Sequence, residues 1–280
     1  MANTKFEMLK DDKVGLMGRT LYRIRALKSF GDVNAGDLGG YIEHESNLSD
    51  TGKCWVYHEA KVGDDAKILD NALIMNEAKI LGKALIEGEV EIYERVLVVD
   101  ARIRDKARLS GECKISGDGT IIRDRAEVHG KAEVSDKVEL FDSAVVSDNA
   151  KVSNKAKVYG SARVYENASI FMKAEIYEKA QVYGSADVSG TAKIHGEAKV
   201  YGNATVWLNA EVHDKAHVYG GTLLTDNVEV AGNVKVYTGT YDGTQKLGVT
   251  RKSVPATKNV DKEIDKELSD LWDRREYKTN

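Results

Sequence analysis

The sequence predicts an all-β protein whose chain winds into a parallel β-helix of six-residue repeats. Three observations predict this fold: the period of six, the two apolar positions within each repeat, and the turn-forming residues that close it. From Ala156 onward each repeat reads Ala, a polar residue, Val or Ile, usually an aromatic residue, and two residues such as Gly and Ser. An α-helix is excluded because its apolar residues recur about every 3.6 positions.

Each hexad predicts one short strand followed by one corner. In residues 156–159, Ala-Lys-Val-Tyr, alternate side chains point to opposite faces of a strand, so the Ala and the Val share the inner face. Gly160 and Ser161 then form the corner, where Gly tolerates the positive φ of a tight turn. The sequence therefore predicts a core of Ala and β-branched residues.

The aliphatic position can be followed from Val56 to Val236 over 31 hexads. One step of five residues, Val98 to Ile103, and one of seven, Ile115 to Ile122, cancel each other. The second inward position is almost always Ala, and Cys113 occupies it, with Cys54 in phase. Both cysteines are expected to be small buried hydrophobes, and a disulfide between their different columns is not expected.

Three hexads close a triangular coil of 18 residues, so 31 hexads predict about ten coils. At a strand spacing of about 4.8 Å the prism is roughly 50 Å long. Each coil needs neighbours on both sides, and an open end would expose unpaired strand edges. We therefore expect a cap at each end of the prism.

The chain divides into four expected segments: an N-terminal cap at 1–47, the β-helix at 48–240, a linker at 241–260 and an amphipathic helix at 261–280. In the cap, Leu21–Leu27 is expected to be a strand, and four glycines are expected to mark turns, namely Gly31, Gly36, Gly39 and Gly40. The helix carries one apolar stripe. Its residues are Ile264, Leu268, Leu271 and Trp272. The stripe is expected to fold back on the last coil, pair between subunits or bind a partner.

Composition excludes some classes of function. Lys plus Arg number 41 and Asp plus Glu 45, a net charge of −4, which gives no overall electrostatic attraction for nucleic acid or anionic membrane. No apolar run has the roughly 18 residues of a membrane span, and the first residues do not resemble a signal peptide. We expect a cytoplasmic protein that binds neither nucleic acid nor membrane.

The repeat resembles the hexapeptide-repeat family, whose members are left-handed parallel β-helices. Residues 21–27 and 36–42 also resemble the opening of YdcK-like proteins of bacteria, bacteriophages and prophages, which are described as acyltransferase-like. The resemblance implies the left hand and a homo-oligomer, with a trimer as the usual state. It also implies a host-cytoplasmic setting for a phage-encoded chain, and, for an acyltransferase, active sites between subunits.

Two histidines are the candidate catalytic residues. His195 and His213 lie 18 residues apart in the outward position after the aliphatic residue, so they should stack in adjacent coils. Either they extend a ladder of aromatic rings, or one of them is the general base of an acyltransferase with an acetyl-CoA or other acyl-CoA donor. No long loop or catalytic motif surrounds them. No metal site is expected, since His213 and His217 diverge across a corner.

Tyrosines form the most regular surface feature. Five of them recur every 18 residues and should lie on one face, namely Tyr165, Tyr183, Tyr201, Tyr219 and Tyr237. Tyr159 and Tyr177 belong to a second column that continues into His195 and His213. These rows are either a binding or oligomer interface or a structural ladder.

Two hypotheses of function follow. In the first, the chain is a non-enzymatic scaffold without a cofactor, which binds another macromolecule; the family resemblance makes this a phage-encoded protein that binds a host factor, such as a defence protein. In the second, it is an acyl-CoA-dependent acyltransferase. The missing lid loop favours the first.

Overall fold

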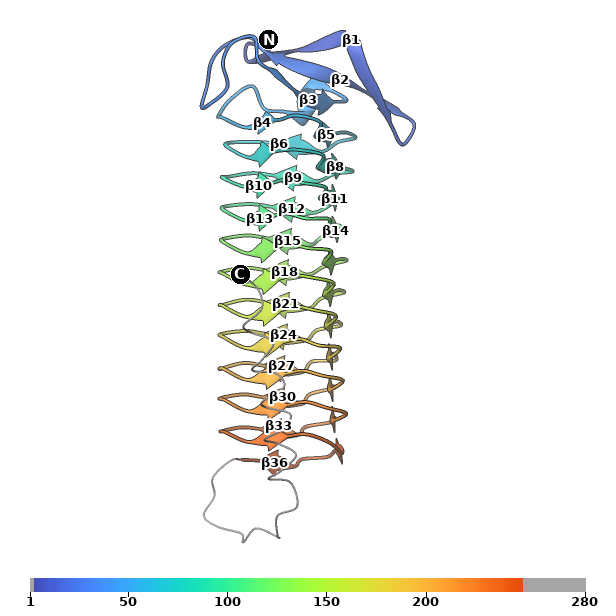
Figure 1. Ribbon diagram of the computed structural model, residues 1–280, viewed down its shortest axis with the longest axis vertical. Helices are drawn as coiled ribbons and strands as arrows, with labels where there is room; N and C mark the ends of the chain where they lie inside the picture. Colours follow the sequence, from blue (N-terminus) through green and yellow to red (C-terminus); the bar gives the residue numbers. More distant parts are fainter. Residues whose placement is uncertain (1–2, 249–280) are drawn as a thin grey trace, which may run out of the picture. The chain divides into compact units, whose positions relative to one another are not determined.

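The computed structural model describes residues 3–248, which form a left-handed parallel β-helix with an N-terminal cap (Figure 1). Each turn of the chain contributes three two- or three-residue strands, and strands of successive turns pair in parallel to build three sheets. The predicted fold class is thus confirmed. The apolar stripe predicted in residues 261–280 lies outside the described residues.

Three sheets form the faces of the prism, and they are named here I, II and III. Sheet I has 14 strands, of which the parallel ones after the cap are β5 Lys61–Val62, β8 Lys79–Leu81, β11 Leu97–Val99, β14 Lys114–Ser116, β17 Glu133–Val134, β20 Lys151–Val152, β23 Ser169–Ile170, β26 Asp187–Val188, β29 Thr205–Val206, β32 Leu223–Leu224 and β35 Thr240–Tyr241. Sheet II has 11 strands, namely β6 Lys67–Ile68, β9 Leu85–Ile86, β12 Arg102–Ile103, β15 Ile121–Ile122, β18 Glu139–Leu140, β21 Lys157–Val158, β24 Glu175–Ile176, β27 Lys193–Ile194, β30 Glu211–Val212, β33 Glu229–Val230 and β36 Lys246–Leu247. Sheet III also has 11 strands, namely β4 Trp55–Val56, β7 Leu73–Ile74, β10 Glu91–Ile92, β13 Arg108–Leu109, β16 Glu127–Val128, β19 Val145–Val146, β22 Arg163–Val164, β25 Gln181–Val182, β28 Lys199–Val200, β31 His217–Val218 and β34 Lys235–Val236.

The β-helix extends past the last predicted hexad. β35 pairs with β32, and β36 pairs with β33, so residues 241–247, which were expected to begin the linker, still belong to the last described coil. The sequence did not predict this coil because Tyr241 and Leu247 replace the usual Ala and Val there. Both side chains are only partly buried.

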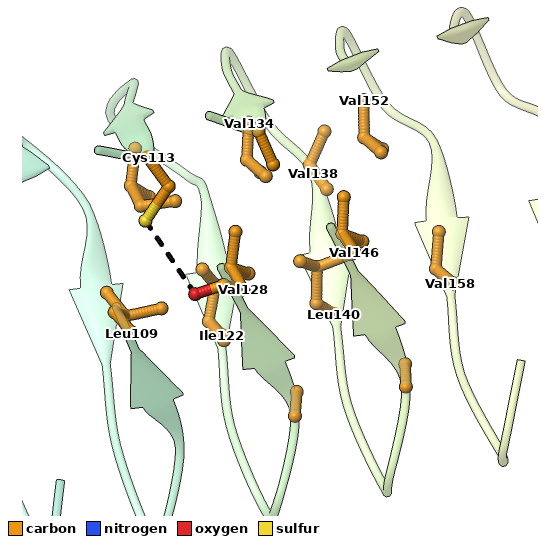
Figure 2. Packing of buried hydrophobic residues seen from close by; sticks show 14 of the residues in the cluster. Leu109, Cys113, Ile122, Val128, Val134, Val138, Leu140, Val146, Val152 and Val158 are labelled. Carbon is orange, nitrogen blue, oxygen red and sulfur yellow. Dashed lines mark hydrogen bonds between the residues drawn. The ribbon is translucent and has the colours of Figure 1, made fainter. Parts of the chain in front are cut away.

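The core consists of the two inward positions of each hexad. Val158 and Ala162 are both fully buried, and the same holds for the inward positions from Val56 to Val230. Figure 2 shows Val and Leu side chains of successive coils in contact, with Cys113 among them and its thiol directed at the Val128 carbonyl oxygen, 3.7 Å away. Burial raises the pKa of the Cys113 thiol to about 12, which keeps it a neutral packing group.

Two corners of unusual length cancel each other. The corner at Asp100 is one residue shorter than the usual corner, and the corner at Gly117–Thr120 is one residue longer. Thr120 takes the inward position usually held by Ala, and its buried hydroxyl lies within hydrogen-bond distance of two carbonyl oxygens, those of Ser116 (2.8 Å) and Asp136 (3.0 Å), between which its one hydrogen is shared. Because the extra polar group is hydrogen bonded, the insertion is accommodated without an unsatisfied buried atom.

The N-terminal cap is an antiparallel extension of sheet I. Strands β1 (Phe6–Leu16) and β2 (Arg19–Ala26) form a hairpin, β3 (Leu38–Ile42) pairs with β2 and, in parallel, with β5, and a short 3-10 helix η1 (Glu45–Asn47) follows. The hairpin lies over the first coil at the blue end of the prism in Figure 1. The fully buried Lys5 ammonium donates to the carbonyl oxygens of Ser49, Thr51 and Cys54.

Two glycines of the cap were predicted wrongly as turn residues. Gly39 and Gly40 lie inside β3 with buried backbones. A Cβ at Gly39 would approach the Ile24 side chain to 2.6 Å, and a Cβ at Gly40 would approach the Ala60 carbonyl oxygen to 2.5 Å. They are glycine because the strand packs closely on the first coil, whereas Gly31 and Gly36 do adopt positive φ.

Candidate functional site

The candidate site is built on sheet III, where one tyrosine from each of five coils projects outward. The rings of Tyr165, Tyr183, Tyr201 and Tyr219 stack face to face with centroid spacings of 4.8, 4.9 and 4.9 Å. The last ring, Tyr237, is tilted by 53° and is 49% exposed. Because each inner ring covers its neighbours' faces, the stack presents ring edges outward, and only its end has a largely exposed ring.

A second stack runs along sheet II. Phe141, Tyr159, Tyr177, His195 and His213 follow one another at 4.7, 4.9, 4.6 and 5.0 Å with nearly parallel rings. Burial in the stack, together with the Glu175 carboxylate, raises the pKa of Tyr159 to about 12. The two predicted columns are therefore present, on two different faces of the prism.

Each candidate catalytic histidine is tied to a carboxylate of the next coil. His195 Nε2 lies 2.9 Å from a Glu211 oxygen, and His213 Nε2 lies 3.3 Å from a Glu229 oxygen. His213 Nδ1 also lies 3.4 Å from an oxygen of Asp214. A hydrogen bond from Lys246, and then one from His213, lowers the pKa of Glu229. The histidines thus take part in an ordered row of ring–carboxylate pairs.

The charge of the polar residue before each aliphatic residue differs from one face of the prism to another. On sheet II it alternates in sign through Lys157, Glu175, Lys193 and Glu211. On sheet III, from β22 to β34, it carries cations and neutral groups alone. This basic column consists of Arg163, Gln181, Lys199, His217 and Lys235.

The basic column is not visible at a period of six, because that period places the polar positions of all three faces in one series of mixed sign. The signal that could have found the column is a period of 18, which assigns every third hexad to the same face. Burial, and then the neighbouring Lys199 and Lys235, lower the pKa of His217. Burial is the larger cause of the lowered pKa, and the positive charge of the two lysines adds to it.

Carboxylates are concentrated at the corners, where many of them hold the next coil. The Gly160 N–H donates to an Asp142 oxygen at 3.0 Å, and the Gly232 N–H donates to an Asp214 oxygen at 2.9 Å. Residues 18 apart are joined in the same way at many corners. These corner acids therefore have structural roles. The side chains on the sheet faces are the candidates for contact with a partner.

Two hollows in the described surface lie away from His195 and His213. One of about 610 Å³ is lined by Asn76, Glu77, Tyr93, Glu94, Arg95, Gly111 and Glu112. Another of about 320 Å³ lies beside the cap loop at Gly31 and Asp32. Within residues 3–248, no three His, Cys, Asp or Glu side chains are grouped so as to hold a metal ion. Nor does the described part of the chain contain a helix long and apolar enough to cross a membrane.

Comparison with known proteins does not assign this chain to a family. No protein-family model matches it, and no curated protein sequence matches it. The class is thus defined at the level of architecture: a left-handed β-helix with one aromatic stack on each of two faces and a basic column beside one of them.

Proposed function

We propose that this protein is a non-enzymatic binding scaffold that holds a macromolecular partner on sheet III. The observation that carries the proposal is the stack of Tyr165 to Tyr237 on a flat and rigid sheet, beside a column of cations. Tyrosine edges on a rigid support give contact area at little cost in conformational entropy, and Tyr and Arg are enriched in protein interfaces. The described hollows do not bring the histidines and a substrate-sized cavity together.

The biological setting of the proposal follows from the family resemblance. A phage- or prophage-encoded chain of this kind would act in the host cytoplasm by binding a host macromolecule, for example a defence protein. A homotrimer, the usual state in the hexapeptide-repeat family, would present three copies of sheet III. Light scattering of the purified chain measures that state directly.

Retention of a host protein by the immobilised chain tests the function. The double variant Tyr183→Ser/Tyr201→Ser should release it, because the ring edges on sheet III would be gone. Serine is already present at this position on sheet I, at Ser153 and Ser189, so the fold accommodates it. Tyr159→Ser/Tyr177→Ser makes the same change on sheet II and is the matched control. Equal release by both variants, or retention by neither wild type nor control, contradicts the proposal.

Acyl transfer is the second candidate function, and one observation favours it. The His195–Glu211 pair is the arrangement that orients a general base. The donor would be acetyl-CoA or another acyl-CoA bound between subunits. Calorimetry should then detect binding of acetyl-CoA, and His195→Gln should abolish transfer while leaving the melting temperature nearly unchanged. Absence of acyl-CoA binding removes this candidate.

A further inference from the structure

The basic column on sheet III is not neutralised by ion pairs with the described residues. Arg163 and Lys235 are exposed and Lys199 is half-buried, and no carboxylate within residues 3–248 lies at ion-pair distance from any of the three. By contrast, Lys157 on sheet II pairs with Glu139 at 3.3 Å. The column therefore carries net positive charge on a chain whose total charge is −4.

The acids at the corners beside the column have partners within the chain and do not pair with its cations. Along the edge that follows the tyrosines, the outward corner residues include one acid, Glu166, whose carboxylate accepts a hydrogen bond from the Gly184 N–H at 2.8 Å. The opposite edge carries three acids and two lysines. Glu178 and Asp214 accept hydrogen bonds from the N–H groups of Gly196 and Gly232, both at 2.9 Å, and Glu197 lies between Lys179 (3.9 Å) and Lys215 (3.6 Å). The charge of the column is thus directed outward, along the row of tyrosine edges.

We infer that sheet III, from β22 to β34, binds an acidic segment of a partner protein along the axis of the prism. The inference rests on the binding function proposed above and names the chemistry of the partner. Carboxylates of the segment would pair with Arg163, Lys199 and Lys235, while its apolar groups would contact the tyrosine edges. Charge complementarity of this kind speeds association and fixes the register of a partner.

The spacing of the cations favours a peptide over a nucleic acid. They lie two coils apart, or about 9.6 Å at a strand spacing of about 4.8 Å. A DNA duplex carries one charge per about 1.7 Å of its axis, so three cations would neutralise only a small part of it. Single-stranded nucleic acid gains affinity by stacking bases on aromatic faces, and here the inner faces are covered by neighbouring rings at 4.8–4.9 Å.

Fluorescently labelled polyglutamate is the probe for this inference, and anisotropy with the full-length chain is the measurement. Binding should weaken with added salt, and the triple variant R163E/K199E/K235E should bind more weakly by about tenfold or more. The control K67E/K155E/K193E changes the net charge equally at exposed lysines away from sheet III, and should bind within about twofold of wild type. Circular dichroism confirms that each variant folds.

Three results overturn the inference. They are equal loss of binding in the control variant, tighter binding of a single-stranded DNA of equal length, and no polyglutamate binding by the wild type. The proposed function fails separately. If the chain ignores polyglutamate yet retains a host protein that Tyr183→Ser/Tyr201→Ser releases, the partner chemistry is wrong and the scaffold function stands. If it also retains no host protein, both are wrong.

Discussion

A single corner residue performs two functions in this fold. Asp142 adopts a φ of 57°, a left-handed conformation that most residues with a Cβ avoid. Its own N–H donates to Asp124 (3.2 Å), and its carboxylate accepts from the Gly160 N–H (3.0 Å). The corner N–H points away from the sheet ladder, and the carboxylate of the preceding coil satisfies it. Asp and Asn are suited to both demands, which explains why they alternate with Gly at the corners.

Substitution of Asp142 separates the two contributions. Asp142→Ala should lower the free energy of unfolding by about 1–2 kcal/mol, since it loses the hydrogen bond and keeps the strained φ. Asp142→Gly should cost less, because glycine removes the strain. Asp142→Asn should be nearly neutral, because an Asn side chain can make the same hydrogen bond. At another corner the Asn154 side-chain oxygen accepts from the Met172 N–H. Urea denaturation measures all three, and an equal cost for Ala and Asn would contradict this account of the corners.

An aromatic stack is the unit of organisation on sheets II and III. A ring within the stack has two parallel neighbours, and a ring at its end has one. Tyr201 lies 4.9 Å from both Tyr183 and Tyr219, whereas Tyr237 is tilted against Tyr219 at 5.2 Å. Stacked aromatic pairs contribute about 0.5–1.5 kcal/mol beyond their buried area, so position within the stack should set the cost of removal.

Serine substitutions along the stack test this order. Tyr201→Ser should cost about 1–3 kcal/mol and Tyr237→Ser less than about 1 kcal/mol. Tyr201→Phe keeps the ring and should be close to neutral. Chemical denaturation of the three variants gives the comparison. A larger loss for Tyr237 than for Tyr201 would show that the stack does not stabilise the prism.

Because of the stack on sheet II, the free energy of unfolding should depend on pH in the alkaline range. The pKa of Tyr159 is raised from 10.0 to about 12 in the folded chain, chiefly by burial. Between these values the unfolded chain releases its proton first, so rising pH favours unfolding. The contribution of Tyr159 is fully present below pH 10 and is lost as the pH rises through about 12. Melting temperatures between these limits should fall less steeply for Tyr159→Phe than for wild type, and identical slopes would contradict the shift.

How far the sequence predicts an element depends on the range of the contacts that define it. The alternation in residues 156–159 predicts strand and core, because it depends on neighbours in sequence. The role of Asp142 and the separation of Arg163 from Glu175 onto different faces depend on residues 18 apart, so a period of six conceals them. Strand β1 was missed because Lys10 to Lys13 interrupt its alternation at a bulge, where register shifts between Leu9 and Lys13.

Whether the histidines act in catalysis stays a prediction, since their ring stacking explains their positions equally well.

The β-helix of the described residues is close to one-dimensional, since each coil contacts mainly its neighbours. A period of six is sufficient for the core, but a period of 18 is required for the surface. A deletion of any multiple of six residues keeps Ala and Val inside, whereas only a multiple of 18 keeps the faces continuous. The two periods can therefore be separated experimentally.

Two deletions ending at the same residue make that separation. Removal of 183–200 joins Val182 to Tyr201 and keeps Tyr165, Tyr201 and Tyr219 on sheet III. Removal of 189–200 joins Val188 to Tyr201 and divides the stack between two faces, although both chains lose Lys199. Both should unfold cooperatively by circular dichroism, and the longer deletion should retain more affinity for polyglutamate. Better binding by the shorter deletion would contradict the assignment of function to one continuous face.

The central claim is that one face of the prism binds the partner, and site-specific photo-cross-linking tests it most directly. A photoreactive phenylalanine analogue replaces Gln181, Asp187 or Lys193, three residues six apart on β25, β26 and β27 that lie on sheets III, I and II. Each full-length chain is irradiated with labelled polyglutamate. The account predicts a cross-link from position 181 and little from 187 or 193. Equal labelling from all three, or stronger labelling from 187 or 193, would contradict it.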